Sequence, residues 1–175
     1  RKLDYSIQIS KLFYERFIKN AEITLFSPNH VPGLYEAFGM PEFDDMYLKY
    51  EKDKSIPKQT IGAQELFQAL LKERAETGRI YIMNLDHCNT HSSFKDKVYM
   101  SNLCQEITLP TTPVQHIDDK EGEIALCILS AVNLGLLTDM DELEELCDLS
   151  VRALDEIIDY QEYPVEAAKI SAQSR

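Results

Sequence analysis

Segments with the apolar spacing of a helix alternate along this chain with short apolar runs that are typical of buried strands. The clearest helix is predicted over 61–76, with Gly78 placed as its C-terminal cap. Its inward-facing residues are expected to be Leu66, Phe67, Leu70 and Leu71. A second long helix follows Asp139 and Glu142, whose spacing is that of a capping box. This alternation predicts a mixed α/β fold.

The other expected elements complete the alternation. They are a helix over 6–19, strands over 22–26 and 79–85, a strand or extended finger over 99–109, helical turns over 32–39 and 41–50, polar loops over 86–96 and 113–121, and an apolar strand-like run over 124–132. The apolar stripe of the last helix is expected to comprise Leu143, Leu146, Leu149, Leu154, Ile157 and Ile158.

Composition narrows the class of protein. The 175 residues are 44% hydrophobic, enough for a sizeable core, and include 30 acidic against 18 basic residues, a formal net charge of −12. Because such a surface repels phosphate backbones and anionic headgroups, we expect neither nucleic-acid nor membrane partners. No apolar run reaches the roughly 18–20 residues of a membrane span. We therefore expect a soluble, cytoplasmic protein with reduced cysteines.

The segment from Ser101 to Ile107 places three chemically active side chains at alternate positions. In extended backbone, residues i, i+2 and i+4 share a face, so the amide of Asn102, the thiol of Cys104 and the carboxylate of Glu106 would line one surface. Each two-residue step of extended chain covers about 6.6 Å. Convergence of the three groups on one small molecule therefore requires this segment to bend or to lie at a loop tip.

The residues around Cys104 do not favour a nucleophilic thiolate. The nearest ionisable group is the carboxylate of Glu106, whose charge disfavours a thiolate, and the nearest basic residue in the sequence is Lys97. This setting suits a cysteine that reacts as a neutral thiol or as a sulfur radical. The alternative is a buried structural cysteine on a strand.

The other cysteines and a histidine cluster are interpreted as structural. Cys127 lies in an apolar run and is expected in the core, where burial makes a thiol inert, and Cys147 is expected to fill space on the last helix. His87, Cys88 and His91 are zinc-ligand types, but no second pair at zinc-finger spacing follows, so we expect no metal site. Walker, dinucleotide-binding and nucleophile-elbow motifs are absent.

Five longer strings stand in the chain in the order LFSPNHVPGLYEAF, TGRIYIMNLDHCNTHS, SNLCQEI, GEIALCILSAVNLG and LDEIIDYQEYPVEAAK. Together they resemble the large catalytic subunit of class I ribonucleotide reductases, over nearly the whole chain. The resemblance implies a section of that family's ten-stranded α/β barrel, with a finger loop that carries the radical cysteine. It also implies that residues 1–175 are a partial catalytic barrel domain, with the N-terminal effector domain and the C-terminal half of the barrel outside them.

The resemblance implies a role for each active residue of the SNLCQEI string. Cys104 would become the thiyl radical that abstracts the 3′ hydrogen of the ribose. Glu106 would be the general base for the 3′-hydroxyl proton, and Asn102 would hydrogen-bond the sugar hydroxyls and help to carry protons. The implied substrate-binding residues are Asn102, Leu103, Cys104, Gln105 and Glu106.

The implied activity is the reduction of ribonucleoside diphosphates to 2′-deoxyribonucleoside diphosphates. Cys127 would be one of two redox-active cysteines that end as a disulfide, its partner lying upstream of residue 1. The implied partners are the substrate, a small radical-generating subunit that contains a metal, a second large subunit, and a thioredoxin or glutaredoxin. No cofactor is implied within this chain, ATP or dNTP effectors would bind outside it, and the chain alone would be inactive.

The residues alone leave a different class of function open. A non-catalytic acidic α/β binding module would act through the last helix, whose charged residues include Glu144, Glu145, Asp148 and Glu156. A truncated, inactive product would carry the same site residues.

Overall fold

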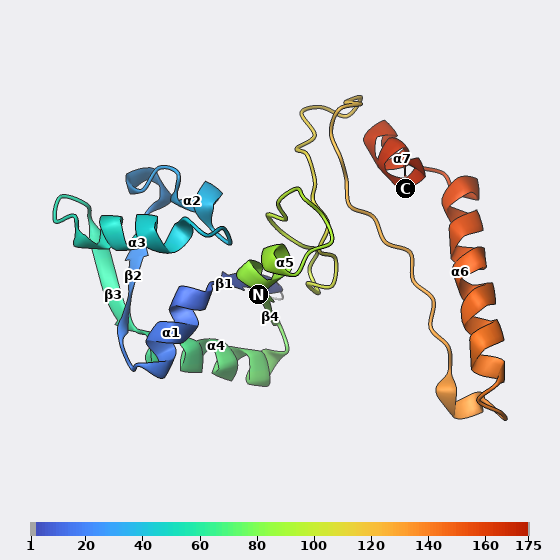
Figure 1. Ribbon diagram of the computed structural model, residues 1–175, viewed down its shortest axis with the longest axis horizontal. Helices are drawn as coiled ribbons and strands as arrows, with labels where there is room; N and C mark the ends of the chain where they lie inside the picture. Colours follow the sequence, from blue (N-terminus) through green and yellow to red (C-terminus); the bar gives the residue numbers. More distant parts are fainter. Residues whose placement is uncertain (1–2, 175) are drawn as a thin grey trace. The chain divides into compact units, whose positions relative to one another are not determined.

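The computed structural model describes residues 3–174 and divides into two compact units, one ending at Pro110 and the other beginning at Thr111. The first unit is a mixed α/β arrangement (Figure 1). Its elements are β1 (Tyr5–Ile9), α1 (Lys11–Ile18), β2 (Glu22–Phe26), the short 3-10 helix η1 (Pro28–His30), α2 (Leu34–Ala37), α3 (Phe43–Lys52), β3 (Lys58–Gly62), α4 (Ala63–Thr77), β4 (Ile80–Asn84) and α5 (Leu85–Thr90).

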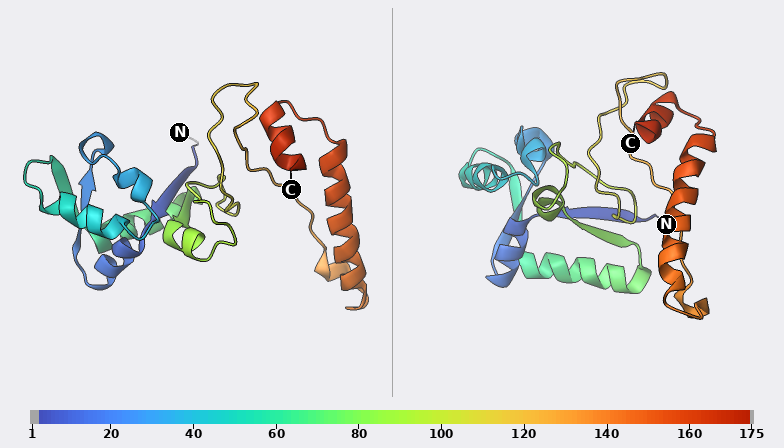
Figure 2. Two further views of the ribbon diagram at one scale, coloured as in Figure 1. Left: turned by 45° about the horizontal axis from the view of Figure 1, so that its top comes forward. Right: turned by 45° about the vertical axis from the view of Figure 1, so that its right-hand side comes forward.

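Strands β1 and β4 form a parallel pair, with Tyr5 opposite Ile80 and Ile9 opposite Asn84. Parallel neighbours need a long connection, which here contains every element from α1 to α4. The last of these, α4, runs along the β1–β4 pair in the right-hand view of Figure 2 and contacts β4. It ends at Gly78, whose left-handed backbone (φ 69°) confirms the predicted cap.

The helix predicted over 6–19 is wrong in its first half. Residues Tyr5–Ile9 form β1, in which polar and apolar side chains alternate, and backbone pairing with β4 determines their conformation. The helix begins only after Ser10, whose hydroxyl accepts a hydrogen bond from the Phe13 N–H at 3.3 Å. The apolar residues of β1 therefore match the helical spacing of α1 by coincidence, which extended the predicted helix into the strand.

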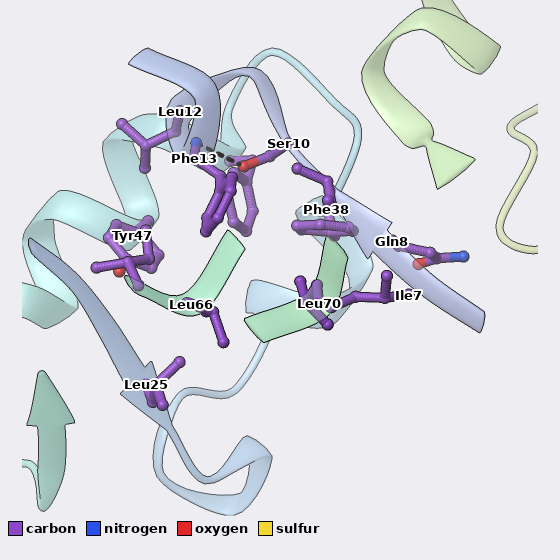
Figure 3. A pocket seen from close by; sticks show the side chains of 13 residues that line it. Ile7, Gln8, Ser10, Leu12, Phe13, Leu25, Phe38, Tyr47, Leu66 and Leu70 are labelled. Atoms are coloured by element: carbon purple, nitrogen blue, oxygen red, sulfur yellow. Dashed lines mark hydrogen bonds between the residues drawn. The ribbon is translucent and has the colours of Figure 1, made fainter. Parts of the chain in front are cut away.

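Aromatic side chains join α1 to α4 in the core of the first unit. Phe67 of α4 contacts the rings of Phe13, Tyr14 and Phe17 of α1, with centroids 5.9, 6.0 and 5.2 Å apart. An apolar cavity of about 230 Å³ lies in the same unit (Figure 3). Side chains that line it include Ile7, Leu12, Phe38, Tyr47, Leu66 and Leu70.

The prediction for α4 needs two corrections. Its expected first residues, Ile61 and Gly62, belong to β3, which pairs antiparallel with β2 and was not predicted. Leu71, expected to face inward, is 43% exposed. The helix therefore starts later and presents a narrower apolar face than its sequence indicates.

Helix α3 confirms the helical turn predicted over 41–50, and β2 confirms the strand over 22–26. The Tyr47 hydroxyl of α3 accepts a hydrogen bond from the Thr24 N–H at 2.6 Å and donates to the Thr24 carbonyl at 2.7 Å. Arg16 of α1 donates two hydrogen bonds to the Glu51 carboxylate, at 2.5 and 2.6 Å, and the Thr24 hydroxyl donates to the same carboxylate. These contacts tie α1, β2 and α3 together.

The second unit contains the 3-10 helix η2 (Leu134–Leu136) and the helices α6 (Glu142–Tyr160) and α7 (Glu166–Gln173). Helix α6 confirms the long helix, but Asp139 and Glu142 do not form a reciprocal capping box. The Asp139 carboxylate accepts from the Asp141 N–H at 3.1 Å, and the Thr138 hydroxyl donates to the Glu142 carboxylate at 2.5 Å. In the predicted apolar stripe, Leu146, Leu149 and Ile157 are exposed.

The loop predicted over 113–121 is confirmed and is organised around Asp119. The carboxylate of this buried residue accepts backbone hydrogen bonds from Gln115, Glu121 and Gly122, at 2.8, 2.8 and 3.2 Å. These donors, Gln115 foremost, hold the pKa of Asp119 below its ordinary value.

The apolar run over 124–132 was predicted as a strand, and that prediction is wrong. None of residues 3–174 pairs with it in a sheet. Its first N–H, on Ile124, donates instead to the Ser171 hydroxyl of α7 at 3.0 Å, while Leu126 and Leu129 are exposed. A strand exists only where a neighbour satisfies its backbone groups, which apolar composition cannot supply.

We expect Glu51→Gln to destabilise the first unit by about 1.5–3 kcal/mol, because the Arg16 guanidinium loses charge-assisted hydrogen bonds. The hydrogen bond from Arg16 holds the pKa of Glu51 below its ordinary value of 4.5. A carboxyl with a lowered folded-state pKa stabilises the fold above its unfolded pKa, so this contribution disappears as the pH falls through the lowered value.

Thermal unfolding of the wild type and of Glu51→Gln, at neutral and at acidic pH, measures this difference. Glu73→Gln changes an exposed carboxyl of α4 in the same way and is the matched control. Equal stability of Glu51→Gln and the wild type at neutral pH would contradict the prediction.

Candidate functional site

The segment from Ser101 to Ile107 bends, as convergence of its active side chains requires. The Gln105 N–H donates to the Asn102 carbonyl at 3.3 Å, which closes a turn around Cys104. The Asn102 Oδ1 accepts hydrogen bonds from the Ile107 N–H at 3.1 Å and from the Ser101 hydroxyl at 3.0 Å. The prediction of a strand over 99–109 is therefore wrong, and the bend that convergence requires is present at residues 102–105.

Gln105 has the left-handed backbone conformation, with φ 71°. This conformation is uncommon for any residue other than glycine. It breaks the strict alternation that would put Asn102, Cys104 and Glu106 on one face, so their shared face is not a property of extended backbone here. The turn at residues 102–105, and not extended backbone, therefore sets where these three side chains lie.

The amide of Gln105 is held by hydrogen bonds on one side only. Its Nε2 donates to the Asn102 carbonyl at 2.9 Å and to the Ser6 hydroxyl of β1 at 2.7 Å. Its Oε1 is buried and accepts no hydrogen bond from the part of the chain that the structure describes. A buried acceptor without a donor costs about 1–3 kcal/mol, so this residue carries two unfavourable features at once.

One face of β1 holds the segment that carries Cys104. The Ser6 hydroxyl lies 3.4 Å from the Leu103 carbonyl, to which it donates, and Gln8 Nε2 donates to the Tyr99 carbonyl at 2.7 Å. Neither β1 residue could be recognised as part of the site from the sequence, because both fall within the helix predicted over 6–19. Their alternation with Ile7 and Ile9, polar then apolar, is the signal that could have identified a strand with one polar face.

Asn89 fixes the backbone just ahead of this segment. Its Oδ1 accepts from the Val98 N–H at 2.9 Å, and its Nδ2 donates to the Val98 carbonyl at 3.0 Å and to the Leu85 carbonyl at 3.1 Å. Asn89 lies on α5, in a stretch predicted to be a polar loop over 86–96, so the first part of that prediction is wrong. Val98, Leu85 and Met83 form a small buried cluster there.

A hollow of about 580 Å³ lies between β1 and the Cys104 segment. Its lining consists of Ser6, Ile7, Gln8, Tyr35, Met100, Ser101, Asn102, Leu103 and Gln105. Two polar residues of β1 thus meet the amides of Asn102 and Gln105 around one space. Cys104 and Glu106 are not part of this lining, and both are exposed.

The exposure of Cys104 excludes the alternative in which it is a buried core cysteine. The nearest basic residue in the sequence, Lys97, is engaged elsewhere. Its ammonium lies 4.5 Å from the ring centre of Tyr99 and donates a hydrogen bond to the Glu36 carbonyl. The thiol therefore does not have the Lys97 cation as a partner.

The other cysteines differ from their predicted settings. Cys127, expected in the core, is exposed in the second unit, because the run over 124–132 is neither paired nor covered in the described residues. Cys147 is exposed on α6 rather than filling space. Cys88 packs against the small cluster of α5, and burial raises the pKa of its thiol.

His87 and His91 stack edge to face on α5, with ring centres 5.3 Å apart. Among residues 3–174, no three His, Cys, Asp or Glu side chains are placed to hold a metal ion. In the same part of the chain, no helix combines the length and the apolar character needed to cross a membrane.

The comparisons with known proteins all point to one family. Residues 1–175 match the family described as "Ribonucleotide reductase, barrel domain". Over 180 residues, the chain is 59% identical to the ribonucleoside-diphosphate reductase subunit alpha of Haemophilus influenzae and 57% identical to ribonucleoside-diphosphate reductase 1 subunit alpha of Escherichia coli. It is 42% identical, over 183 residues, to the subunit alpha of Enterobacteria phage T4. Each match covers 100% of this chain and 24% of the relative.

We expect Asn89→Ala to release Val98 and the backbone that leads to Cys104. Because the substitution removes both hydrogen bonds between the Asn89 side chain and Val98, the Val98 amide hydrogen should exchange with solvent about tenfold faster. NMR-detected hydrogen exchange measures this rate. The Ile82 amide in β4 should keep its rate, and Asn133→Ala, in the second unit, is the control. An unchanged Val98 rate would show that the contacts do not hold this backbone.

Proposed function

The chain belongs to the ribonucleotide reductase barrel-domain family, and we propose that it is part of a catalytic subunit that reduces ribonucleoside diphosphates to 2′-deoxyribonucleoside diphosphates. The observation that carries this proposal is the turn around Cys104, an exposed residue that lies in sequence between the amide of Asn102 and the carboxylate of Glu106. The chain spans about a quarter of the relatives it matches. We therefore assign residues 1–175 to a section of the barrel, with the effector domain and the rest of the barrel outside this section.

In the proposed reaction, the Cys104 sulfur carries a thiyl radical and takes the 3′ hydrogen atom of the ribose. The Glu106 carboxylate accepts the proton of the 3′ hydroxyl. The 2′ hydroxyl leaves as water, and a pair of thiols supplies two electrons and two protons and becomes a disulfide. Return of a hydrogen atom to the sugar regenerates the radical on Cys104. Thiol and carboxylate thus have separate tasks, and neither requires a nucleophilic thiolate.

The hydrogen bonds of the Asn102 side chain support its proposed role as a donor to the sugar hydroxyls. Its Oδ1 is occupied by the Ile107 N–H and the Ser101 hydroxyl, which fix the orientation of the amide. Within residues 3–174, its Nδ2 donates to no protein acceptor, so both of its N–H groups are available to a substrate. Leu103 and Gln105 line the adjacent hollow with Asn102, and we propose that the substrate is held against this turn.

Cys104 is exposed here, whereas a radical needs protection from solvent. We propose that the remaining barrel strands of the longer relatives enclose this turn, which then forms the finger loop of the closed barrel. Cys127 is exposed as well, which suits a thiol that must form a disulfide with a second cysteine and be reduced again by an external dithiol. We assign that second cysteine to a segment outside residues 1–175.

The proposal implies several partners. In the proposed assembly, a separate small subunit that contains a metal supplies the radical to Cys104. The disulfide formed with Cys127 must be reduced again by an external dithiol, for which a thioredoxin or glutaredoxin is suited. A second large subunit and nucleotide effectors, bound outside these residues, complete the proposed assembly.

We expect Cys104→Ser, in the complete catalytic subunit, to lower deoxynucleotide formation by at least about a thousandfold, because a hydroxyl does not replace the thiol as a radical carrier. Substrate affinity should stay within about twofold, since the turn does not depend on the sulfur. The assay uses a ribonucleoside diphosphate, the small subunit and a dithiol. Cys147→Ser removes another exposed thiol and should keep wild-type turnover. Turnover by Cys104→Ser would overturn the proposal.

Cys127→Ser tests the supply of electrons separately. With an excess of external dithiol, we expect this variant to bind substrate normally and to lose sustained turnover, because the disulfide cannot form. Product accumulation over many turnovers distinguishes this outcome from a slow but continuing reaction. Sustained formation of deoxynucleotide would show that Cys127 is not the electron donor, even if the assignment of Cys104 stands.

A further inference from the structure

We propose that Ser6 of β1 and Gln105 form a latch that positions the Cys104 turn, so that Gln105 acts on the reaction through the placement of its neighbour. The effect of this latch on turnover rests on the proposed function. The latch itself consists of the hydrogen bond from Gln105 Nε2 to the Ser6 hydroxyl, 2.7 Å long, and of the Ser6 hydroxyl near the Leu103 carbonyl.

The orientation of the Gln105 amide is determined by its neighbours. Three oxygens surround its Nε2, namely the Asn102 carbonyl at 2.9 Å, the Ser6 hydroxyl at 2.7 Å and the Leu103 carbonyl at 3.5 Å. Carbonyl oxygens only accept hydrogen bonds, so the nitrogen and not the oxygen of the amide must face them. The Gln105 amide thereby links the two ends of the turn to each other, through the Asn102 carbonyl, and to β1, through Ser6.

The two unfavourable features of Gln105 support a positioning role. Its backbone is left-handed at φ 71°, and its Oε1 is buried without a hydrogen-bond donor in the described residues. A glycine at this position would remove the first feature, and an aliphatic side chain would remove the second. Strain of this kind clusters where the surrounding structure requires one geometry for function. Here that geometry places Cys104 at the tip of the turn.

The attachment also has a rigid base. β1 is paired with β4 along five residues, and Gln8, on the same face of β1 as Ser6, donates to the Tyr99 carbonyl at 2.7 Å. The Cys104 segment is thus fixed to the strand at two places, before the turn and within it. Loss of the Ser6 contact would free the turn and leave the approach to it in place.

Ser6→Ala and Ser6→Thr, made in the complete catalytic subunit, test the latch. Alanine removes the hydroxyl, whereas threonine keeps it and suits a strand. In Ser6→Ala, we expect kcat to fall about ten- to a hundredfold, because a small misplacement of the reacting sulfur is costly, with the KM of the ribonucleoside diphosphate within about twofold. Ser6→Thr should keep kcat near the wild-type value. A rise in KM at constant kcat would instead make the residue a substrate contact and overturn the proposal.

Gln105→Leu removes the other half of the latch, and Gln68→Leu, at an exposed position of α4, is its matched control. The double variant Ser6→Ala with Gln105→Leu should lose less than the two single losses combined, because both changes remove the hydrogen bond between Gln105 and Ser6, and only the Ser6–Leu103 contact is lost in addition. Fully additive losses would overturn the proposal. Thermal unfolding shows whether Gln105→Leu folds. If it does not fold, the comparison of kcat between Ser6→Ala and Ser6→Thr tests the latch by itself.

Hydrogen exchange tests the latch independently of turnover. The amides of Gln105 and Ile107 are hydrogen-bonded within the turn and should exchange several-fold faster in Ser6→Ala than in the wild type or Ser6→Thr. Unchanged exchange would disprove the latch whatever the kinetics. If the wild-type subunit forms no deoxynucleotide while exchange responds as expected, the proposed function fails and the latch stands.

Discussion

The parallel pairing of β1 with β4 is the constraint on which the first unit depends. It gives β1 two unlike faces, because side chains alternate along a strand. Ile9 on one face is buried in the core, while Ser6 and Gln8 on the other hold the segment that carries Cys104. The same five residues thus connect the core to the candidate site, and the position of Cys104 depends on a strand far from it in sequence.

Local sequence patterns predicted those helices and strands whose own residues determine their secondary structure. Helix α4 has a clear apolar face and a glycine cap, and β2 ends before a proline, so both were predicted closely. β1 was not, since its apolar residues fit the helix that follows as well as a strand, and only the distant partner β4 distinguishes the two. The run at 124–132 shows the converse, because strand-like composition without a neighbouring strand remains irregular chain.

The candidate site was predictable in its chemistry and not in its geometry. An amide, a thiol and a carboxylate within five residues can be read from the sequence, and the reach of extended chain already required a bend. The form of that bend depends on Gln105, whose left-handed backbone accompanies a hydrogen bond to Ser6, 99 positions away. The exposure of Cys127 could not be predicted either, because the burial of an apolar run depends on which other segments pack over it, and composition does not specify those segments.

The sheet of β1 and β4 has only these two strands in the described part of the chain, so each strand has one free edge. Such edges present unpaired N–H and C=O groups, which attract further strands of any origin. A closed barrel is the arrangement in which every edge finds a partner. Until such partners pair with them, these two edges can also pair with strands of other chains, so aggregation through its edges is the characteristic risk of this two-stranded sheet.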